Sequence, residues 1–175
     1  ILIETVGVGQ SETYVRGMVD FFLLLVLTGA GDELQGMKKG IMELADGILV
    51  HKADGDNLRP ARKTVQEYKQ ILHFLQPSTP GWTSTSLAAS SLEKTGLDEV
   101  WKMITTFEET IKKSNYWTVR RHEQTRDWFH SMITDHLIDS FYKNASRKAH
   151  VRELEYAILH GRLTVTQGVN QLFEE

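Results

Sequence analysis

Seven consecutive apolar residues, Phe21 to Leu27, lead directly into the glycine-rich run Thr28-Gly29-Ala30-Gly31. Such a run is too short to cross a bilayer, which needs roughly 20 apolar residues in a helix. It is apolar on both faces, which is typical of a strand at the centre of a parallel sheet. A second apolar strand, Gly47 to Val50, is also followed by a polar, glycine-containing loop. The pattern therefore predicts parallel βαβ units.

The remaining periodicity extends this prediction and then changes. The expected strands are 1–3, 21–27, 47–50 and 84–89, and the expected helices between them are 12–20, 32–45 with Asp32 as its cap, 57–75 and 97–111. After about residue 115 the pattern predicts only helices, at 117–143, 147–160 and 165–174, with Gly161 before the last. We therefore expect an α/β domain of three layers over 1–115 and an all-helical extension over 116–175.

Composition narrows the classes of function. The 175 residues contain no cysteine, which excludes disulfides, thiolate zinc sites and a cysteine nucleophile and is compatible with a reducing cytoplasm. A net charge of -3 gives no electrostatic indication of nucleic acid or an anionic membrane as partner. The chain opens on Ile1 without a basic start or a cleavage motif, so we do not expect its first residues to be a signal peptide. We interpret Ile1 as a truncation point.

The loop after the strand 47–50 carries the most specific chemistry. Lys52 and Asp54 form a Lys-x-Asp motif directly after this strand, which is the guanine-reading arrangement of GTP-binding proteins. A carboxylate accepts hydrogen bonds from the ring N–H and the exocyclic amine of guanine, and adenine offers neither group there. The alternative is a solvated turn, because Lys-x-Asp is common by chance.

The loop after the fourth expected strand contains Ser90, Ser91 and Leu92. The carboxyl ends of parallel strands meet at one edge of a sheet, so this loop is expected beside the Lys-x-Asp loop. The backbone N–H of Ser91 can then reach the guanine O6. The alternative is that the two serines are polar caps before the helix at 97–111.

The loop after the first expected strand begins with Glu4 and, three residues later, Gly7. An acid followed by x-x-Gly resembles the GTPase motif in which the acid holds a Mg²⁺-bound water and the glycine N–H contacts the γ-phosphate. Glu4 stands where most GTPases have Asp. Gln10 is a further candidate for positioning the attacking water, although it lies farther along than the residue that usually does so.

Four segments together resemble one family. They are ETVGVGQSE at 4–12, GAGDELQGMKKGIMELAD at 29–46, KADGD at 52–56 and SLEKTGLDEVW at 91–101. These segments are similar to those of the MeaB-type P-loop GTPases, a family also known as LAO/AO transport kinases that includes the methylmalonic aciduria type A protein. The resemblance covers nearly the whole chain, and its most specific part is 29–46.

The resemblance implies a GTP- and Mg²⁺-dependent GTPase that assembles or protects a cobalamin-dependent acyl-CoA mutase, methylmalonyl-CoA mutase. By this resemblance, Glu4 and Gly7 correspond to the family's magnesium and γ-phosphate motif, and residues 8–12 correspond to its switch II. The segment 29–39 resembles a loop called switch III, which relays the nucleotide state to the mutase. Its candidate coupling residues are Asp32, Glu33, Gln35, Lys38 and Lys39.

The family's guanine pocket corresponds to His51, Lys52, Asp54, Ser90, Ser91 and Leu92. Two residues depart from the family pattern. His51 replaces the usual Asn of N-K-x-D, which affects affinity more than the guanine specificity that depends on Asp54. Thr28 replaces a proline that is common before the G-A-G turn, and leaves that turn less constrained.

Neither a G-x-x-x-x-G-K-[ST] loop nor a switch I segment occurs in these 175 residues. The chain therefore carries half of a nucleotide site, and we do not expect it to hydrolyse GTP alone. The seven histidines lack metal-binding spacing, and the cobalamin motif D-x-H-x-x-G is absent. We therefore expect neither a histidine metal site nor direct corrin binding.

The helical extension carries a wide apolar stripe, made of Trp128, Phe129, Met132, Ile133, Leu137, Phe141 and Tyr142. One interpretation is that the stripe packs against the parent domain. Because members of the family are homodimers through this region, we favour a second interpretation, in which one seam meets a second chain in a homodimer. The location implied is the cytoplasm, or the mitochondrial matrix in a eukaryote. Two other functions stay open: a non-hydrolysing interaction and dimerisation module, and a kinase of a lysine/arginine/ornithine transport system.

Overall fold

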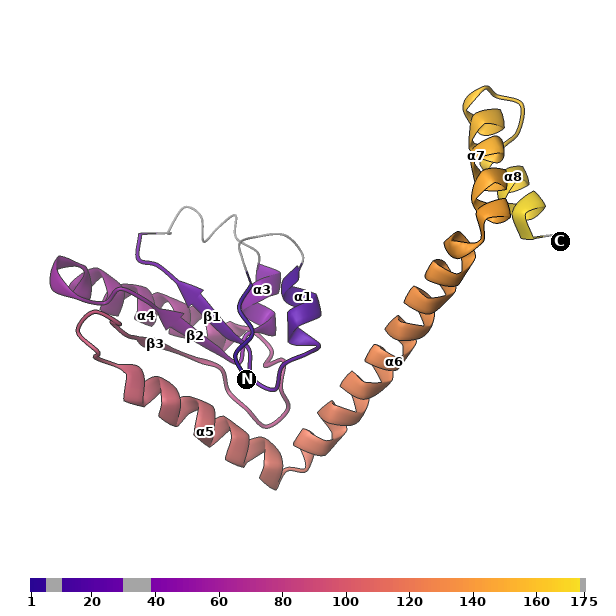
Figure 1. The fold of residues 1–175 in the computed structure, drawn as a ribbon. Helices are drawn as coiled ribbons and strands as arrows, with labels where there is room; N and C mark the ends of the chain where they lie inside the picture. The colour runs from indigo at the N-terminus through magenta and orange to yellow at the C-terminus, as the bar shows by residue number, and fades with distance from the viewer. Residues whose placement is uncertain (6–10, 30–38, 174–175) are drawn as a thin grey trace. The chain divides into compact units, whose positions relative to one another are not determined.

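The computed structural model describes residues 1–5, 11–29 and 39–173 (Figure 1). By contacts the chain divides into two compact units, Ile1–Gln124 and Thr125–Glu175. The functional division expected at residue 115 stays a prediction.

The first unit is built on a parallel sheet of β1 (Leu23–Val26), β2 (Gly47–Val50) and β3 (Thr85–Ala88), in the order β1-β2-β3. The register aligns Val26 with Val50 and Val50 with Ala88. The three strands therefore end side by side, and the loops that follow them emerge at one edge of the sheet. This confirms the parallel arrangement predicted from the alternation of strands and helices.

Helices precede, connect and follow these strands. They are α1 (Ser11–Arg16), α3 (Lys39–Leu44), the short 3₁₀ helix η1 (Gly55–Asn57), α4 (Leu58–Phe74) and α5 (Leu97–Lys113). α4 forms because apolar residues recur along it at steps of three and four, which gives one buried face. The helix ends at Phe74, three residues before Pro77, which cannot continue it.

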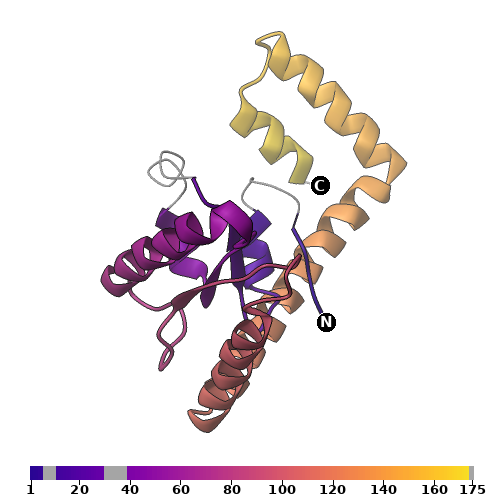
Figure 2. The same ribbon diagram turned by 90° about the vertical axis from the view of Figure 1, so that its left-hand side faces the viewer.

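The core lies on both faces of β2. Ile48 and Val50, which point to the same face of the strand, are fully buried in a cluster that includes Ala61 and Tyr68 of α4. Leu49 points to the other face and packs with Val100 of α5. Burying each of these larger side chains contributes about 1.5–3 kcal/mol. The result is three layers, with α4 and α5 on opposite faces of the sheet (Figures 1 and 2).

Two expectations for the amino-terminal part are wrong. Residues 1–3 were expected to form a buried strand, but they contain no strand and are exposed. Leu25 and Leu27 were expected to be buried on a central strand, yet they are 61% and 50% exposed. Among the described strands, β1 pairs only with β2. As an edge strand it leaves these side chains without a neighbour on one side.

The second unit is helical, as predicted. α6 (Tyr116–Lys143) begins in the first unit and continues into the second, followed by α7 (Ala145–Leu159) and α8 (Val165–Phe173). Asn144 caps α7, because its side chain accepts a hydrogen bond from the backbone N–H of Arg147 at 3.1 Å. α8 packs on α7. No helix in the described ranges is both long and apolar enough to cross a membrane.

Candidate functional site: a loop cluster at the carboxyl edge of the sheet

The loop after β2 is held by the ends of both neighbouring strands. The backbone N–H of His51 donates to the carbonyl of Val26 at the end of β1, at 2.9 Å. The N–H of Ala53 donates to the carbonyl of Ala89, just beyond β3, at 3.1 Å. Ala53 is also buried. The Lys-x-Asp segment is therefore fixed at this edge and is not a loose turn.

Asp54 contacts the loop that follows β3. The hydroxyl of Ser90, which is fully buried, donates a short hydrogen bond to Oδ2 of Asp54. A carboxylate offers about four acceptor positions, so one serine donor leaves room for two further N–H groups. The structure thus brings together two residues that the sequence assigned to the same guanine pocket.

Ser90 also organises its own loop. Its backbone exchanges two hydrogen bonds with Thr95, at 3.0 and 3.1 Å, and its hydroxyl accepts from the N–H of Glu93 at 3.1 Å. The residue before α5 is Gly96, with a φ of 76°. Ser90 is therefore not the cap of this helix, and its hydroxyl supports Asp54 and the turn instead.

The other candidate residues of this edge lie closer to solvent. Nε2 of His51 lies 2.9 Å from the hydroxyl oxygen of Ser91, so these two side chains are hydrogen-bonded. Lys52 is exposed and has a φ of 57°, in the left-handed region that side chains disfavour. Leu92 is 83% exposed. Six candidate guanine-pocket residues therefore lie in two loops joined by two side-chain hydrogen bonds.

Sequence reasoning missed Asn57 at this edge. Its Nδ2 donates to the carbonyl of Lys52 at 2.5 Å, and its Oδ1 accepts from the hydroxyl of Thr28 at 2.5 Å. Asn57 precedes α4, where an asparagine is usually read as a helix cap, but its side chain makes no cap hydrogen bond. The position alone therefore points to a different role from the one the structure gives it.

The candidate residues for phosphate and metal are not assembled in the described part of the chain. Glu4 lies in the exposed segment 1–5. The catalytic candidates Gly7 and Gln10, and the coupling candidates Asp32, Glu33, Gln35 and Lys38, lie outside the described residues. Lys39 begins α3. Within 1–5, 11–29 and 39–173, no three acidic or histidine side chains form a group that could hold a metal ion.

A second polar cluster lies away from the guanine-pocket candidates, where β2 begins, and the sequence analysis did not find it. Asp46 is fully buried and accepts from the backbone N–H of Phe22 at 2.9 Å and from the hydroxyl of Thr79 at 2.5 Å. Arg16 and Arg120 approach the same carboxylate, at 3.0 and 3.9 Å. Burial lowers the pKa of Arg16, while the charge of Asp46 acts in the opposite direction.

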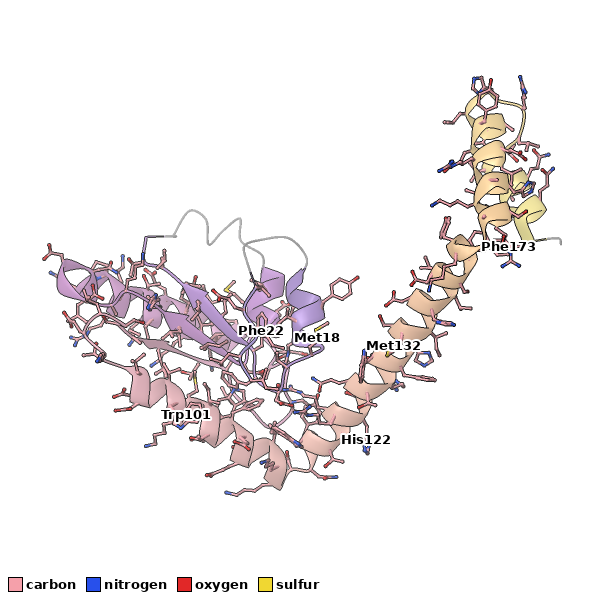
Figure 3. The ribbon with its side chains drawn as sticks, in the orientation of Figure 1. Met18, Phe22, Trp101, His122, Met132 and Phe173 are labelled. Atoms are coloured by element: carbon pink, nitrogen blue, oxygen red, sulfur yellow. The ribbon has the colours of Figure 1, made fainter. Side chains whose placement is uncertain are left out.

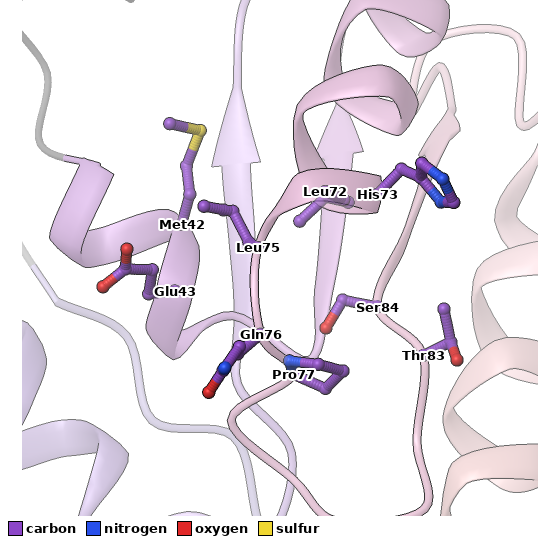
Figure 4. A pocket seen from close by; sticks show the side chains of 9 residues that line it. All are labelled: Met42, Glu43, Leu72, His73, Leu75, Gln76, Pro77, Thr83 and Ser84. Atoms are coloured by element: carbon purple, nitrogen blue, oxygen red, sulfur yellow. The ribbon is translucent and has the colours of Figure 1, made fainter.

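One pocket also lies away from the loop cluster. It is lined by Met42, Glu43, Leu72, His73, Leu75, Gln76, Pro77, Thr83 and Ser84 (Figure 4). These residues come from α3, the end of α4 and the segment before β3. α3 ends before β2 and α4 ends before β3, so the pocket lies toward the amino ends of the strands. It is not the site that the Lys-x-Asp motif predicts.

The fold and the sequence both match known proteins. The model of the family described as methylmalonyl Co-A mutase-associated GTPase MeaB matches residues 1–146. A solved structure described as an LAO/AO transport system kinase superposes with a TM-score of 0.75 at 34% identity, over 97% of this chain and 54% of that one. The expected fold is thus confirmed: a parallel α/β portion of a P-loop GTPase followed by a helical extension.

Curated relatives agree with this assignment. A putative GTPase from Caulobacter vibrioides is 41% identical over 98% of this chain and 52% of its own length. GTPase ArgK from Escherichia coli is 36% identical over 99% and 53%. The mitochondrial methylmalonic aciduria type A homolog of Mus musculus is 34% identical over 99% and 42%. The chain spans about half the length of the relatives it matches. It belongs to the MeaB family of methylmalonyl-CoA mutase-associated GTPases.

Proposed function

We propose that this chain carries the guanine-recognition half of a GTPase that couples its nucleotide state to a cobalamin-dependent acyl-CoA mutase. The observation that carries the proposal is the contact between Asp54 and the buried Ser90, which joins the Lys-x-Asp loop to the Ser-x-Leu loop. Family membership supports the reaction, GTP hydrolysis. The family description and the mouse relative's name support the mutase as partner.

The chemistry proposed for the described residues is recognition of the base. The Asp54 carboxylate accepts from guanine N1–H and the exocyclic amine, and Ser90 holds that carboxylate in place. The stem of Lys52 lies along the base, and the N–H of Ser91 reaches O6. Hydrolysis itself is positioning and charge stabilisation. A carboxylate oxygen suits Mg²⁺, so Glu4 would hold a magnesium-bound water, and magnesium would neutralise charge on the phosphates.

The test is a change of base specificity in the full-length protein. Asp54→Asn exchanges an acceptor for a donor, which suits xanthine because its 2-position is a carbonyl oxygen. Competition of labelled GTP against XTP and ATP should show a change of preference from GTP to XTP of about 10⁴-fold. Asp56→Asn is the matched control, since Asp56 is exposed two residues later and should leave the preference unchanged. If Asp54→Asn still prefers GTP, the Lys-x-Asp motif does not read guanine.

A second candidate function is a non-hydrolysing interaction module, and the helical unit favours it. Six apolar residues of α6 in the stripe defined above are between 40% and 67% exposed: Trp128, Phe129, Met132, Ile133, Leu137 and Tyr142. Exposed apolar area of this kind is typical of an interface. GTP turnover by the full-length protein, above that of Glu4→Ala, would decide for the GTPase.

A further inference from the structure

The side chain of Asn57 joins two loops that are separate in the sequence. It donates from Nδ2 to the backbone carbonyl of Lys52 and accepts at Oδ1 from Thr28, which lies just beyond β1. The separations along the chain are 5 and 29 residues. The backbone N–H of Asn57 also donates to the carbonyl of Asp54 at 2.9 Å. A single side chain thus connects the Lys-x-Asp loop to the end of the edge strand.

The carbonyl that Asn57 binds belongs to a residue in an unfavourable conformation. Lys52 has a φ of 57°, and a residue with a Cβ is less stable there than in the right-handed region by about 1–2 kcal/mol. Lys52 lies between two residues whose backbone N–H groups are hydrogen-bonded to neighbouring strand ends: His51 donates to Val26, and Ala53 donates to Ala89. The left-handed conformation of Lys52 allows both hydrogen bonds. The hydrogen bond from Asn57 therefore stabilises a backbone geometry that would otherwise be poorly populated.

Three features suit asparagine to this position. Its amide has both a donor and an acceptor, and both are used. The donor at Thr28 fixes which end of the amide points to Lys52. The usual duty of an asparagine before a helix, accepting from the first-turn N–H groups, is not performed here. By contrast, Asn144 does perform this duty for α7.

We propose that Asn57 is a positioning residue for guanine binding: its amide holds the left-handed Lys52 peptide, and Thr28 orients that amide. This inference rests on the proposed function, because it concerns the same loop. Without the amide, the Lys-x-Asp loop occupies the binding geometry for a smaller fraction of the time, and the apparent affinity falls by that fraction. GTP and GDP lose affinity by the same factor, since both carry the base that this loop is proposed to bind.

The experiment measures dissociation constants for GTP and GDP in the full-length protein. Asn57→Ala removes both hydrogen bonds and should weaken both nucleotides about tenfold or more, with the loss in KM and not in kcat. Thr28→Val keeps the shape but removes the donor, and should weaken binding about threefold to tenfold. Thr28→Ser restores the donor and should restore the affinity. In the double variant, Thr28→Val should add nothing to Asn57→Ala, because both changes remove the same bond.

The control is Asn144→Ala, which removes an asparagine that does cap a helix. It should lower the melting temperature and leave both dissociation constants unchanged. Wild-type affinity in Asn57→Ala, or fully additive losses in the double variant, would overturn the inference. If Asn57→Ala does not fold, Thr28→Val and its serine rescue decide the matter. Failure of this inference is distinguishable from failure of the proposed function, since Asp54→Asn tests the latter in the wild-type background.

Discussion

Both terminal nitrogens of the Arg16 guanidinium contact the carboxylate of Asp46: Nη2 donates to Oδ1 at 3.1 Å, and Nη1 lies 3.0 Å from Oδ2. The side chain of Asp46 is completely buried and that of Arg16 is 12% exposed. Removing one partner of a buried ion pair leaves the other charge without compensation. We therefore expect the protein to lose stability when Asp46 is removed.

Asp46→Ala should lower the free energy of unfolding by about 3–5 kcal/mol, because Arg16 and the N–H of Phe22 lose their acceptor. Urea titration followed by circular dichroism measures this change. Asp127→Ala is the control, since the side chain of Asp127 is 73% exposed, and it should change stability by no more than about 0.5 kcal/mol. Similar midpoints for the two variants would show that the buried pair contributes little.

Gly96→Ala should destabilise the first unit and weaken guanine binding together. Gly96 has a φ of 76°, and a Cβ there would lie 2.2 Å from the carbonyl oxygen of Ala88. Strain and displacement should cost about 2–5 kcal/mol and shift the loop that holds Ser90. At Gly81, whose φ is 78°, a Cβ meets nothing within 4 Å, so Gly81→Ala should cost only about 1 kcal/mol. Equal losses would mean that the approach to Ala88 relaxes freely.

His51→Asn should tighten GTP binding and leave the preference for guanine over xanthine unchanged. The imidazole of His51 is hydrogen-bonded to Ser91, whereas the family's usual asparagine supports the base and the phosphate loop. Ser91→Ala removes the hydrogen bond between Ser91 and His51 without changing His51, and should weaken GTP binding by about tenfold or less. Dissociation constants for GTP and XTP test both variants. A change of base preference in His51→Asn would mean that residue 51 itself reads the base.

Changes in the segment 29–39 should separate coupling from chemistry. The resemblance assigns Gln35 and Lys38 to the relay of nucleotide state to the mutase. In the full-length protein, Gln35→Ala or Lys38→Ala should preserve basal GTP hydrolysis and reduce its stimulation by the mutase. Lys63→Ala, on the exposed face of α4, is the matched charge control and should affect neither rate. Parallel loss of both rates would assign these residues to the reaction itself.

Trp128→Ala should weaken the proposed homodimer. Trp128 on α6 is 67% exposed, and Trp101 on α5 is 66% exposed, so the two offer a matched pair. Figure 3 labels Trp101 and also Met132, which lies one helical turn beyond Trp128. Sedimentation velocity should show a weaker dimer for Trp128→Ala and an unchanged one for Trp101→Ala. The reverse result would move the interface to the α/β unit.

The sequence predicted well those elements that local pattern determines. The strand 47–50 was predicted to the residue. The helix at 58–74 differs from the prediction by one residue at each end, and the helix at 97–113 begins as predicted and ends two residues later. The strand predicted at residues 1–3 was wrong, because an apolar run needs a hydrogen-bonded neighbouring strand, and the sequence pattern does not show whether there is one. The Lys-x-Asp loop was found because its motif is contiguous.

The sequence could not reveal the roles of Asp46 and Asn57. The partners of Asp46 come from α1, from the loop near Thr79 and from α6, so no local spacing marks the cluster. Asn57 occupies a position where a cap is the usual interpretation. In both cases the role depends on long-range contacts, which a single sequence does not show.

The contacts of Arg120 have a consequence for the order of folding. Arg120 donates to the carbonyl of Asp20, 100 residues earlier in the chain, and to Thr79 beside Asp46. During synthesis the sheet and both of its helical layers leave the ribosome before this arginine does. The α/β unit therefore completes its polar cluster only when the first turns of α6 have emerged, because until then Asp46 and Thr79 have Arg16 but lack Arg120 as a partner.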